Sequence, residues 1–263
     1  MEMTGTDDNL QPSQCRDKTE TALDRLRLIM GDAALERLAN SRVMVLGLGG
    51  VGSSCAEALA RGGIGSLVLV DRDVVMPSNI NRQALAFHST IERPKTEVMR
   101  AMIADINPDC EVHAERFFID KDSAAEQLSS LPRPDYVVDA IDTISQKLKI
   151  AAWCQAEGIP EVAAMGGANK LDPTRLRFAQ LDETKMDPIA RVMRKESRKR
   201  GIRSFPVLYS DELPREAQGK QGVLDEKGFV REGSSILGSM SYFPPIMGQM
   251  LAGYVIRQLA GLE

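Results

Sequence analysis

Short apolar runs alternate with amphipathic segments along the first 165 residues, a pattern typical of strands and helices that follow one another in turn. The apolar runs predict strands at residues 43–46, 66–70, 111–118, 136–141 and 161–164. Helical periodicity predicts two short helices within residues 23–39 and further helices at 53–61, 95–106, 124–130 and 144–157. Residues 74–93 follow neither period and are expected to be irregular. This order predicts an α/β fold: a mostly parallel sheet with helices on both faces.

The regular alternation of predicted strands and helices ends at Gly166. Beyond it we expect a strand at 176–180, a basic helix at 188–201, a mobile polar loop at 219–233 and an apolar helix at 244–259 that packs back on the core. Within the two short helices, Asp32 is expected to cap the second after a break at Gly31. The predicted domains are a disordered lead-in at 1–21, a core at 22–165 and a C-terminal extension at 166–263.

Composition narrows the class of protein. The 263 residues are 43% hydrophobic and 27% charged, with a formal net charge of −4, which is ordinary for a globular protein and argues against wholesale coating of nucleic acid. No apolar run reaches the roughly 20 residues that span a bilayer. The polar first 20 residues have no signal-peptide core. We therefore expect a cytoplasmic protein with no membrane partner.

The number and spacing of the cysteines and histidines do not favour a metal site. The four cysteines, at positions 15, 55, 110 and 154, form no C-x-x-C pair, and the chain has only two histidines. Structural zinc sites need closely spaced pairs of such ligands, so we expect no zinc. Cys55 lies in an apolar helix pattern and is expected to pack in the core.

A glycine-rich loop lies between the first predicted strand and the helix after it. It has the form G-x-G-x-x-G, with glycines at positions 47, 49, 50 and 52. Glycines let backbone N–H groups approach phosphates, and the following helix N-terminus adds partial positive charge. Asp71 ends the next strand, where a carboxylate would bind ribose hydroxyls. The motif predicts a Rossmann-like nucleotide-binding core; the alternative is that the glycines serve only tight packing.

The residues after the second strand bear on which nucleotide binds. The segments Asp71–Asp73 and Ser78–Gln83 are dense in polar groups, Lys95 opens the next helix, and Asp142 follows the fourth strand. A triphosphate needs cations and magnesium, and Asp142 would hold magnesium at the sheet edge. Taken singly, Arg82 could be a surface ion-pair partner, Lys95 a solvated residue and Asp142 part of a helix cap. Together, at one edge, they favour a triphosphate over a dinucleotide.

A basic belt follows in the C-terminal extension. Its members are Arg191, Arg194, Lys195, Arg198, Lys199, Arg200 and Arg203, with Glu196 as the only acid among them. Such a belt suits contact with a phosphate backbone. The alternative is a solvated surface helix.

Five motifs together resemble the ThiF/HesA/MoeB superfamily, relatives of ubiquitin-activating enzymes. They are G-x-G-G-V-G, V-D-x-D, S-N-x-N-R-Q, a following lysine and V-D-A-x-D, and lie within residues 25–142. The resemblance implies that the protein uses Mg-ATP to adenylate a carboxylate. It implies that the loop glycines cradle phosphates, Asp71 holds the ribose, and Asp142 binds Mg²⁺. The nucleotide contacts that it implies further are Asp73, Asn79, Arg82, Gln83 and Lys95.

The resemblance also implies a homodimer, in which Arg25 reaches the ATP of the partner subunit. Family members carry R-F-x-R at this place, and here the first arginine is replaced by Ala22. Some members carry a cysteine before the loop predicted at 219–233, but the stretch 205–212 has none, so a thioester relay has no evident residue there.

Within the superfamily, the chain resembles the bacterial tRNA threonylcarbamoyladenosine dehydratases over most of residues 22–260. The features shared are G-G-A at 166–168, D-P-T at 172–174, D-P at 187–188 and the basic helix. This resemblance implies a tRNA partner gripped by the basic helix, and cyclisation of the threonylcarbamoyl group after adenylation. A sulfur-transfer partner protein is left open.

Three other functions are weighed against this one. An enzyme that adenylates a ubiquitin-like sulfur-carrier protein would use the same ATP site, but such relatives often hold zinc through two C-x-x-C pairs. A nucleotide sensor without catalysis would not need Arg82, Lys95 and Asp142 together. An NAD oxidoreductase would not need the polar segment after Asp71.

Overall fold

The computed structural model describes residues 20–120, 122–216 and 237–262. Its centre is one seven-stranded sheet in the order β3-β2-β1-β4-β5-β7-β6. The strands are β1 (Arg42–Leu46), β2 (Ser66–Val70), β3 (Glu111–Glu115), β4 (Tyr136–Asp139), β5 (Glu161–Ala164), β6 (Leu176–Gln180) and β7 (Pro206–Ser210). Every neighbouring pair is parallel except β6 with β7. The predicted fold class is confirmed, whereas residues 1–19 of the expected lead-in and the loop expected at 219–233 lie outside the described residues.

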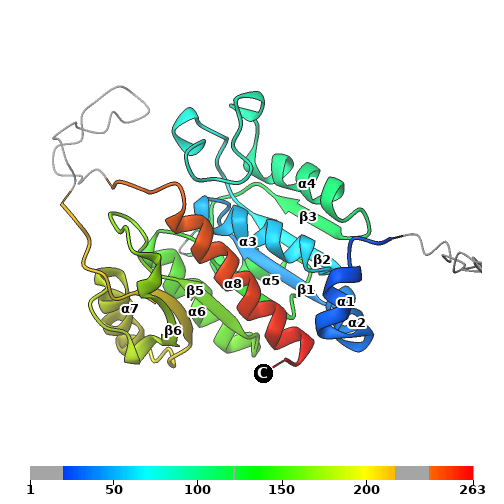
Figure 1. The fold of residues 1–263 in the computed structure, drawn as a ribbon. Helices are drawn as coiled ribbons and strands as arrows, with labels where there is room; N and C mark the ends of the chain where they lie inside the picture. The colour runs from blue at the N-terminus through cyan, green and yellow to red at the C-terminus, as the bar shows by residue number, and fades with distance from the viewer. Residues whose placement is uncertain (1–19, 121, 217–236, 263) are drawn as a thin grey trace, which may run out of the picture.

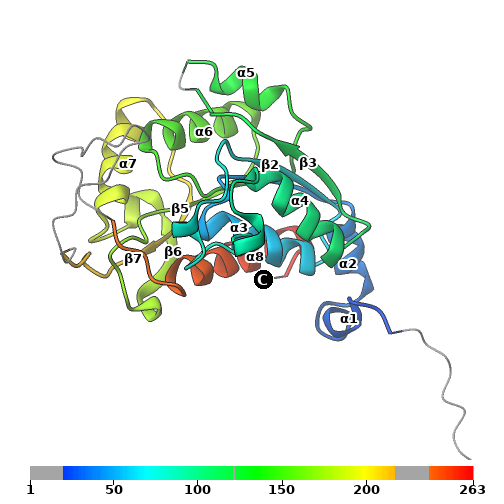
Figure 2. The same ribbon diagram turned by 90° about the horizontal axis from the view of Figure 1, so that it is seen from above.

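Helices cover both faces of the sheet, as Figures 1 and 2 show. They are α1 (Asp24–Met30), α2 (Asp32–Ala39), α3 (Gly50–Arg61), α4 (Lys95–Ile106), α5 (Ala124–Ser129), α6 (Ile144–Glu157), α7 (Pro188–Lys199) and α8 (Phe243–Ala260). Short 3-10 turns lie at η1 (Pro77–Asn79), η2 (His88–Thr90), η3 (Pro173–Arg175) and η4 (Leu181–Glu183). In the described part of the chain no helix has both the length and the apolar character needed to cross a membrane.

The central strands are apolar at most positions because both of their faces are buried, and their polar residues lie at the strand ends. In β1, Val43 and Val45 join the core beneath α3, α4 and α8, while Met44 and Leu46 join the core beneath α5 and α6. A third cluster lies between α7 and the β5–β7 side of the sheet. Cys55 is fully buried in the first core, as predicted.

Several predicted boundaries need correction. The strand expected at 111–118 ends at Glu115, and that expected at 136–141 ends at Asp139. Just after β4 the backbone of Ala140 lies against the glycine loop, 3.1 Å from where a Cβ on Gly47 would stand. The helix expected from Ser53 begins three residues earlier, at Gly50, and Asp32 does not cap α2, whose N-cap is Gly31 with no side-chain hydrogen bond.

The strand β7 was not predicted. It opens with Pro206, which is tolerated at the first position of a strand. Through β7 and β6 the C-terminal extension continues the same sheet, and α8 lies alongside α3 (Figure 1). The two helices lie so close that a Cβ on Gly248 would stand 2.2 Å from the carbonyl oxygen of Val51. The division at residue 165 stays a prediction.

Candidate functional site

The glycine loop joins the end of β1 to the start of α3. Gly47 has φ +86°, a conformation that other residues rarely adopt. A Cβ on Gly52 would lie 1.7 Å from the carbonyl oxygen of Gly47, so this turn requires glycine. Gly49 is the N-cap of α3 and Gly50 its first residue. The predicted loop is therefore present, with unpaired helix N–H groups at the carboxyl edge of the sheet, where a phosphate would bind.

Asp71 secures this loop. One of its carboxylate oxygens accepts a hydrogen bond from the Leu48 N–H at 2.6 Å, and the other accepts from the Asp73 N–H at 2.8 Å. Each carboxylate oxygen has a second lone pair, so contact with a ribose is still open to it. The ribose role of Asp71 stays a prediction.

Arg82 lies against the glycine loop. A Cβ on Gly50 would stand 3.2 Å from Arg82 Cγ, so glycine at this position gives the arginine room. Its Nη1 donates to the Ser78 carbonyl at 2.9 Å and to Asn81 Oδ1 at 2.8 Å. Partial burial lowers the pKa of the guanidinium. Among the described residues Arg82 makes no ion pair, which removes the alternative of a surface salt bridge within this part of the chain.

The rest of the S-N-x-N-R-Q motif is packed beneath Arg82. Asn79 is buried, and its Oδ1 accepts from the Met76 N–H at 3.0 Å. Gln83 is buried too, and its Oε1 has no hydrogen-bond partner in the part of the chain that the structure describes. Ser53, which no sequence argument singled out, donates to the Gly49 carbonyl and accepts from the Ala84 N–H, and so ties the motif to the glycine loop.

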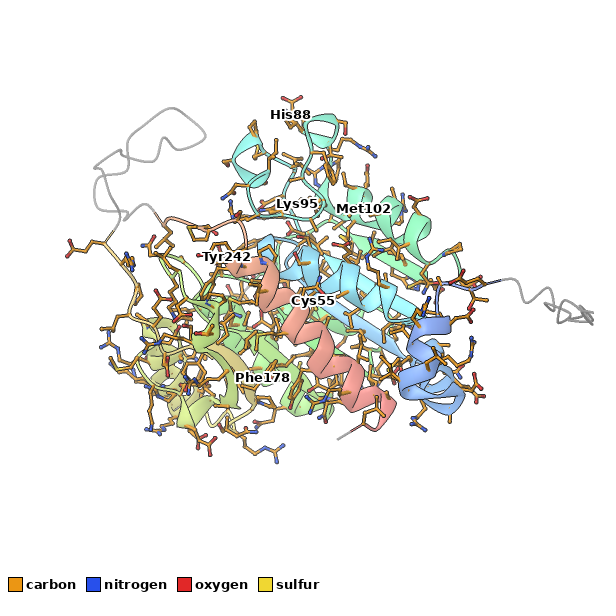
Figure 3. All side chains as sticks on the ribbon, viewed as in Figure 1. Cys55, His88, Lys95, Met102, Phe178 and Tyr242 are labelled. Carbon is orange, nitrogen blue, oxygen red and sulfur yellow. The ribbon has the colours of Figure 1, made fainter. Side chains whose placement is uncertain are left out.

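Lys95 is not the solvated residue of the alternative interpretation. Its side chain is only 6% exposed, and its Nζ lies 3.3 Å from Asp73 Oδ2. Figure 3 shows Lys95 in the upper part of the molecule, level with Met102 and above Tyr242. The structure thus joins Lys95 and Asp73 into one ion pair beside Asp71.

Asp142 is exposed, three residues beyond the end of β4. The following helix α6 has Thr143 as its N-cap without a side-chain hydrogen bond, so the capping alternative is not seen. No group of three or more His, Cys, Asp or Glu side chains that could hold a metal occurs in the described residues. Mg²⁺ needs fewer protein ligands, since one or two carboxylates and the substrate phosphates suffice. The exposed Asp142 carboxylate, whose Oδ1 accepts a hydrogen bond from Thr143 Oγ1 at 3.3 Å, still has lone pairs for such a role.

Arg25 is not brought to its own glycine loop. It is exposed on α1, and the neighbouring Leu23 lies against Gly63, beyond the opposite end of α3. A helix of 12 residues is about 18 Å long. Any contact of Arg25 with a nucleotide therefore requires a second subunit.

With this geometry in view, comparison with known proteins gives a consistent result. The model of the ThiF family matches residues 22–263. A tRNA threonylcarbamoyladenosine dehydratase of Bacillus subtilis is 43% identical over 239 residues, which cover 89% of this chain and 93% of the relative. The chain belongs to the ThiF family.

Solved structures agree with this assignment. The Escherichia coli tRNA N6-threonylcarbamoyladenosine dehydratase, TcdA, in complex with AMP superposes with a TM-score of 0.78 at 29% identity, over 92% of this chain and 98% of the other. The same enzyme in complex with ATP gives a TM-score of 0.75 at 29% identity, with the same coverage. These relatives bear out both the superfamily resemblance and the narrower one.

In this ThiF-family chain the basic belt is only partly on α7 and only partly free. Arg194 donates to the Thr184 carbonyl, and Lys199 and Arg200 both pair with Glu196. These contacts lower the pKa of the Glu196 carboxyl to about 2. In the described chain, the exposed members whose side chains make no hydrogen bond or ion pair are Arg191, Lys195, Arg198 and Arg203.

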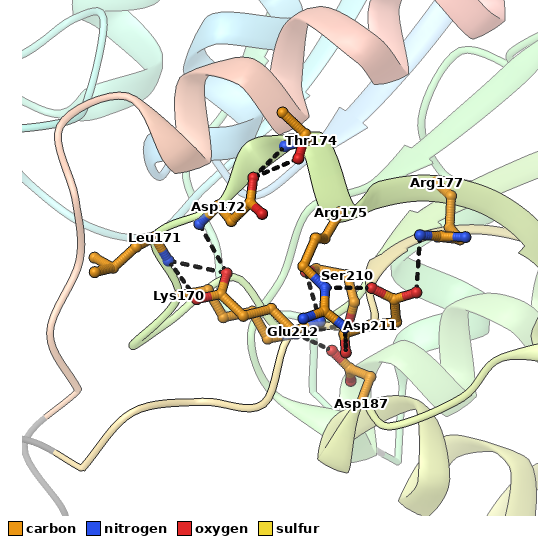
Figure 4. Close-up of polar contacts among 10 residues, drawn as sticks. All are labelled: Lys170, Leu171, Asp172, Thr174, Arg175, Arg177, Asp187, Ser210, Asp211 and Glu212. Carbon is orange, nitrogen blue, oxygen red and sulfur yellow. Dashed lines mark hydrogen bonds and ion pairs between the residues drawn. The ribbon is translucent and has the colours of Figure 1, made fainter.

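A buried polar network fixes α7 to the sheet (Figure 4). Asp187 caps α7 by accepting from the Ala190 N–H at 2.8 Å, and its other oxygen lies 2.7 Å from Lys170 Nζ. Both side chains are almost fully buried, and Lys170 also donates to the Ser210 carbonyl at the end of β7. Glu212 accepts from the Leu171 and Asp172 N–H groups. No local sequence pattern predicts the pairing of Lys170 with Asp187, because the two residues are 17 positions apart.

A second buried cluster lies under Asp142. Lys147 Nζ stands 3.1 Å from the Asp139 carboxylate and 3.3 Å from its backbone oxygen. Burial raises the pKa of Asp139, and the Lys147 charge opposes that rise. Beside them, burial and then the charge of Asp139 raise the pKa of Glu161 to about 8. Sequence reasoning quoted Asp139 within a motif but gave no role to any of the three.

Proposed function

We propose that this protein is an ATP-dependent tRNA threonylcarbamoyladenosine dehydratase. The observation that carries the proposal is the 43% identity to the Bacillus subtilis enzyme along nearly the whole of both chains. The site supports it, since the glycine loop, Arg82 and Asp142 stand at one edge of the sheet. A cytoplasmic location goes with a tRNA substrate.

The reaction needs positioning and positive charge rather than a covalent nucleophile. A carboxylate oxygen of the threonyl group attacks the α-phosphate of ATP, and pyrophosphate leaves. The carbamoyl group then attacks the acyl carbon and AMP leaves with the former carboxylate oxygen. The ring that forms is an oxazolone or a hydantoin, and the nucleoside has lost one water overall.

The residues of this chain have distinct parts in that scheme. The loop glycines cradle the phosphates, and Asp71 holds the ribose. Arg82 and Lys95 offset the charge that develops on pyrophosphate. When bound, Mg²⁺ adds positive charge at the phosphates, and Asp142 is the side chain that would hold it.

The proposal includes a homodimer in which Arg25 completes the site of the partner subunit. Arg25 is exposed, and on the same short helix Leu28 and Ile29 are 80% and 83% exposed. Large apolar side chains this open are typical of a surface that another protein covers. A second copy of the chain packed against α1 would cover these two side chains, and Arg25 would then lie at the interface with the partner subunit.

The proposed tRNA contact is the α7 stripe, which we define as Arg191, Lys195 and Arg198. Their spacing of four and then three residues places them on one face of the helix. The opposite face, with Ala190 and Met193, is buried in the third core cluster. An unpaired row of cations of this kind suits a phosphate backbone.

The deciding experiment weighs nucleosides. Purified protein is incubated with Mg-ATP and tRNA that carries threonylcarbamoyladenosine, and the tRNA is then digested for mass spectrometry. An ATP-dependent loss of one water from the modified adenosine supports the proposal. Arg82→Ala and Asp142→Ala should give no product in the time that the wild type needs. An unchanged mass in the presence of bound ATP refutes it.

A further inference from the structure

The side chain of Asn81 bridges Arg82 and the C-terminal extension. Its Oδ1 accepts from Arg82 Nη1 at 2.8 Å, and its Nδ2 donates to the Ser239 carbonyl at 3.0 Å. Only one orientation of the amide serves both, because a guanidinium can only donate and a carbonyl can only accept. Asn81 and Ser239 are 158 residues apart in sequence.

This bridge restricts the orientation of the Arg82 guanidinium. Both hydrogens of Nη1 are used, by Asn81 and by the Ser78 carbonyl. In the described residues Nε and Nη2 make no hydrogen bond, so these donors remain for a ligand. The arginine already lies against Gly50, and the bridge therefore fixes how its free edge meets the phosphate loop.

The Ser239 end of the bridge is itself anchored. Gly238 N–H donates to Asn169 Oδ1 at 2.6 Å, and Asn169 N–H donates back to the Gly238 carbonyl at 2.9 Å. Four residues after Gly238, the Tyr242 hydroxyl donates to the Leu171 carbonyl at 2.8 Å. The segment 238–242 is thus held by the loop that follows β5, next to Lys170 and its ion pair with Asp187.

We propose that Asn81 is a positioning residue, which orients Arg82 toward the phosphates of ATP and makes that orientation depend on the anchored segment 238–242. This rests on the phosphate-binding role of Arg82 in the proposed function. Arg82 and the segment 238–242 are coupled because both are hydrogen-bonded to the Asn81 side chain, and breaking either bond costs free energy.

The test compares the affinities of the purified full-length protein for ATP and for AMP by titration calorimetry. Only ATP carries the phosphates that Arg82 would meet. Losing an oriented, charge-assisted contact should weaken ATP binding by roughly tenfold in Asn81→Ala, with AMP binding changed less than about twofold. A general loss of structure would weaken both nucleotides. The measurement involves no tRNA, so its outcome is separate from that of the dehydratase assay.

Two further variants test whether Asn81 acts through Arg82 and whether the anchored segment 238–242 matters. If Asn81 acts through Arg82, adding Asn81→Ala to Arg82→Ala should weaken ATP binding no further. Asn169→Gly keeps the left-handed backbone of Asn169 (φ 59°) but removes the acceptor for Gly238, and should weaken ATP selectively as well. Gln249→Ala is the matched control, because Gln249 also joins the extension to the core, through the Ser54 carbonyl, without touching Arg82. It should leave both affinities unchanged.

Each contrary result overturns the proposal. Unchanged ATP affinity in Asn81→Ala would remove the positioning role. Equal weakening of ATP and AMP would make that role merely structural. Additive losses in the double variant would show that Asn81 acts apart from Arg82, and normal ATP binding in Asn169→Gly would show that the anchor has no influence.

Discussion

The buried carboxyl of Glu161 gives a prediction about stability that can be worked from the structure. Glu161 lies on β5, its side chain is close to Asp139, and its Oε2 has no hydrogen-bond partner in the described residues. Its pKa rises from an ordinary 4.5 to about 8, mainly through burial. In the unfolded chain the same group ionises near 4.5, so between these values the folded protein holds a proton that the unfolded chain has lost.

The sign and size follow from proton linkage. Stability from this group is fully present below about pH 4.5 and is lost as the pH rises through about 8. At about 1.4 kcal/mol for each pH unit between the two values, the ceiling is about 5 kcal/mol. Relaxation and water entry reduce such penalties, so Glu161→Gln should gain roughly 2–5 kcal/mol over the wild type near pH 8.5. Near pH 5 the two proteins should differ by less than about 1 kcal/mol.

The assay is urea unfolding at both pH values and at one protein concentration. The chain has a single tryptophan, Trp153, which is buried with its Nε1 donating to Ser129, so its fluorescence reports unfolding. Glu157→Gln is the matched control, since Glu157 is an exposed partner of Arg133. If Glu161→Gln shows the same pH dependence as the wild type, or is less stable near pH 8.5, the carboxyl is ionised in the fold and the reasoning is refuted.

Three other predictions concern the site. Reversing the charges of the α7 stripe should weaken tRNA binding and lower the slope of log affinity against log salt by about 2–3. Reversing Lys199 and Arg200, which already pair with Glu196, should lower this slope less, and equal slopes in the two variants would contradict the assignment. Mixing inactive Arg25→Ala and Arg82→Ala subunits should restore dehydratase activity through hybrid dimers, and a mixture that stays inactive would count against a shared site. Gly52→Ala should abolish ATP binding in calorimetry, because its Cβ would collide with the Gly47 carbonyl; normal affinity would mean that the loop has another conformation.

Much of the core was predictable because its signals are local. The helices α4 and α6 and the strands β2, β5 and β6 begin and end at the predicted residues, since glycine, proline or asparagine bounds most of these runs. The glycine loop was predictable for the same reason, since Gly47 and Gly52 are required by the conformation of the loop itself.

What could not be predicted depends on residues far apart in the chain. The partner of Asn81 is Ser239, and the cap of α7 is supported by Lys170. The pKa of Glu161 depends on Asp139, in the neighbouring strand. No period or motif carries such pairings, because they exist only once the sheet has brought its strands together. The strand β7 begins with a proline, which in a sequence argues against a strand in the interior of a sheet.

The packing of α8 alongside α3 has a consequence for the order in which the protein can be made. A ribosome synthesises α8 after every other element described, yet Gly248 packs on the backbone of Val51 and Cys55, in the helix that begins at the phosphate loop. Pro244 reaches Gly50 itself. A nascent chain therefore exposes an unfinished nucleotide site until α8 has left the exit tunnel, so binding competence follows the synthesis of α8 rather than that of the loop.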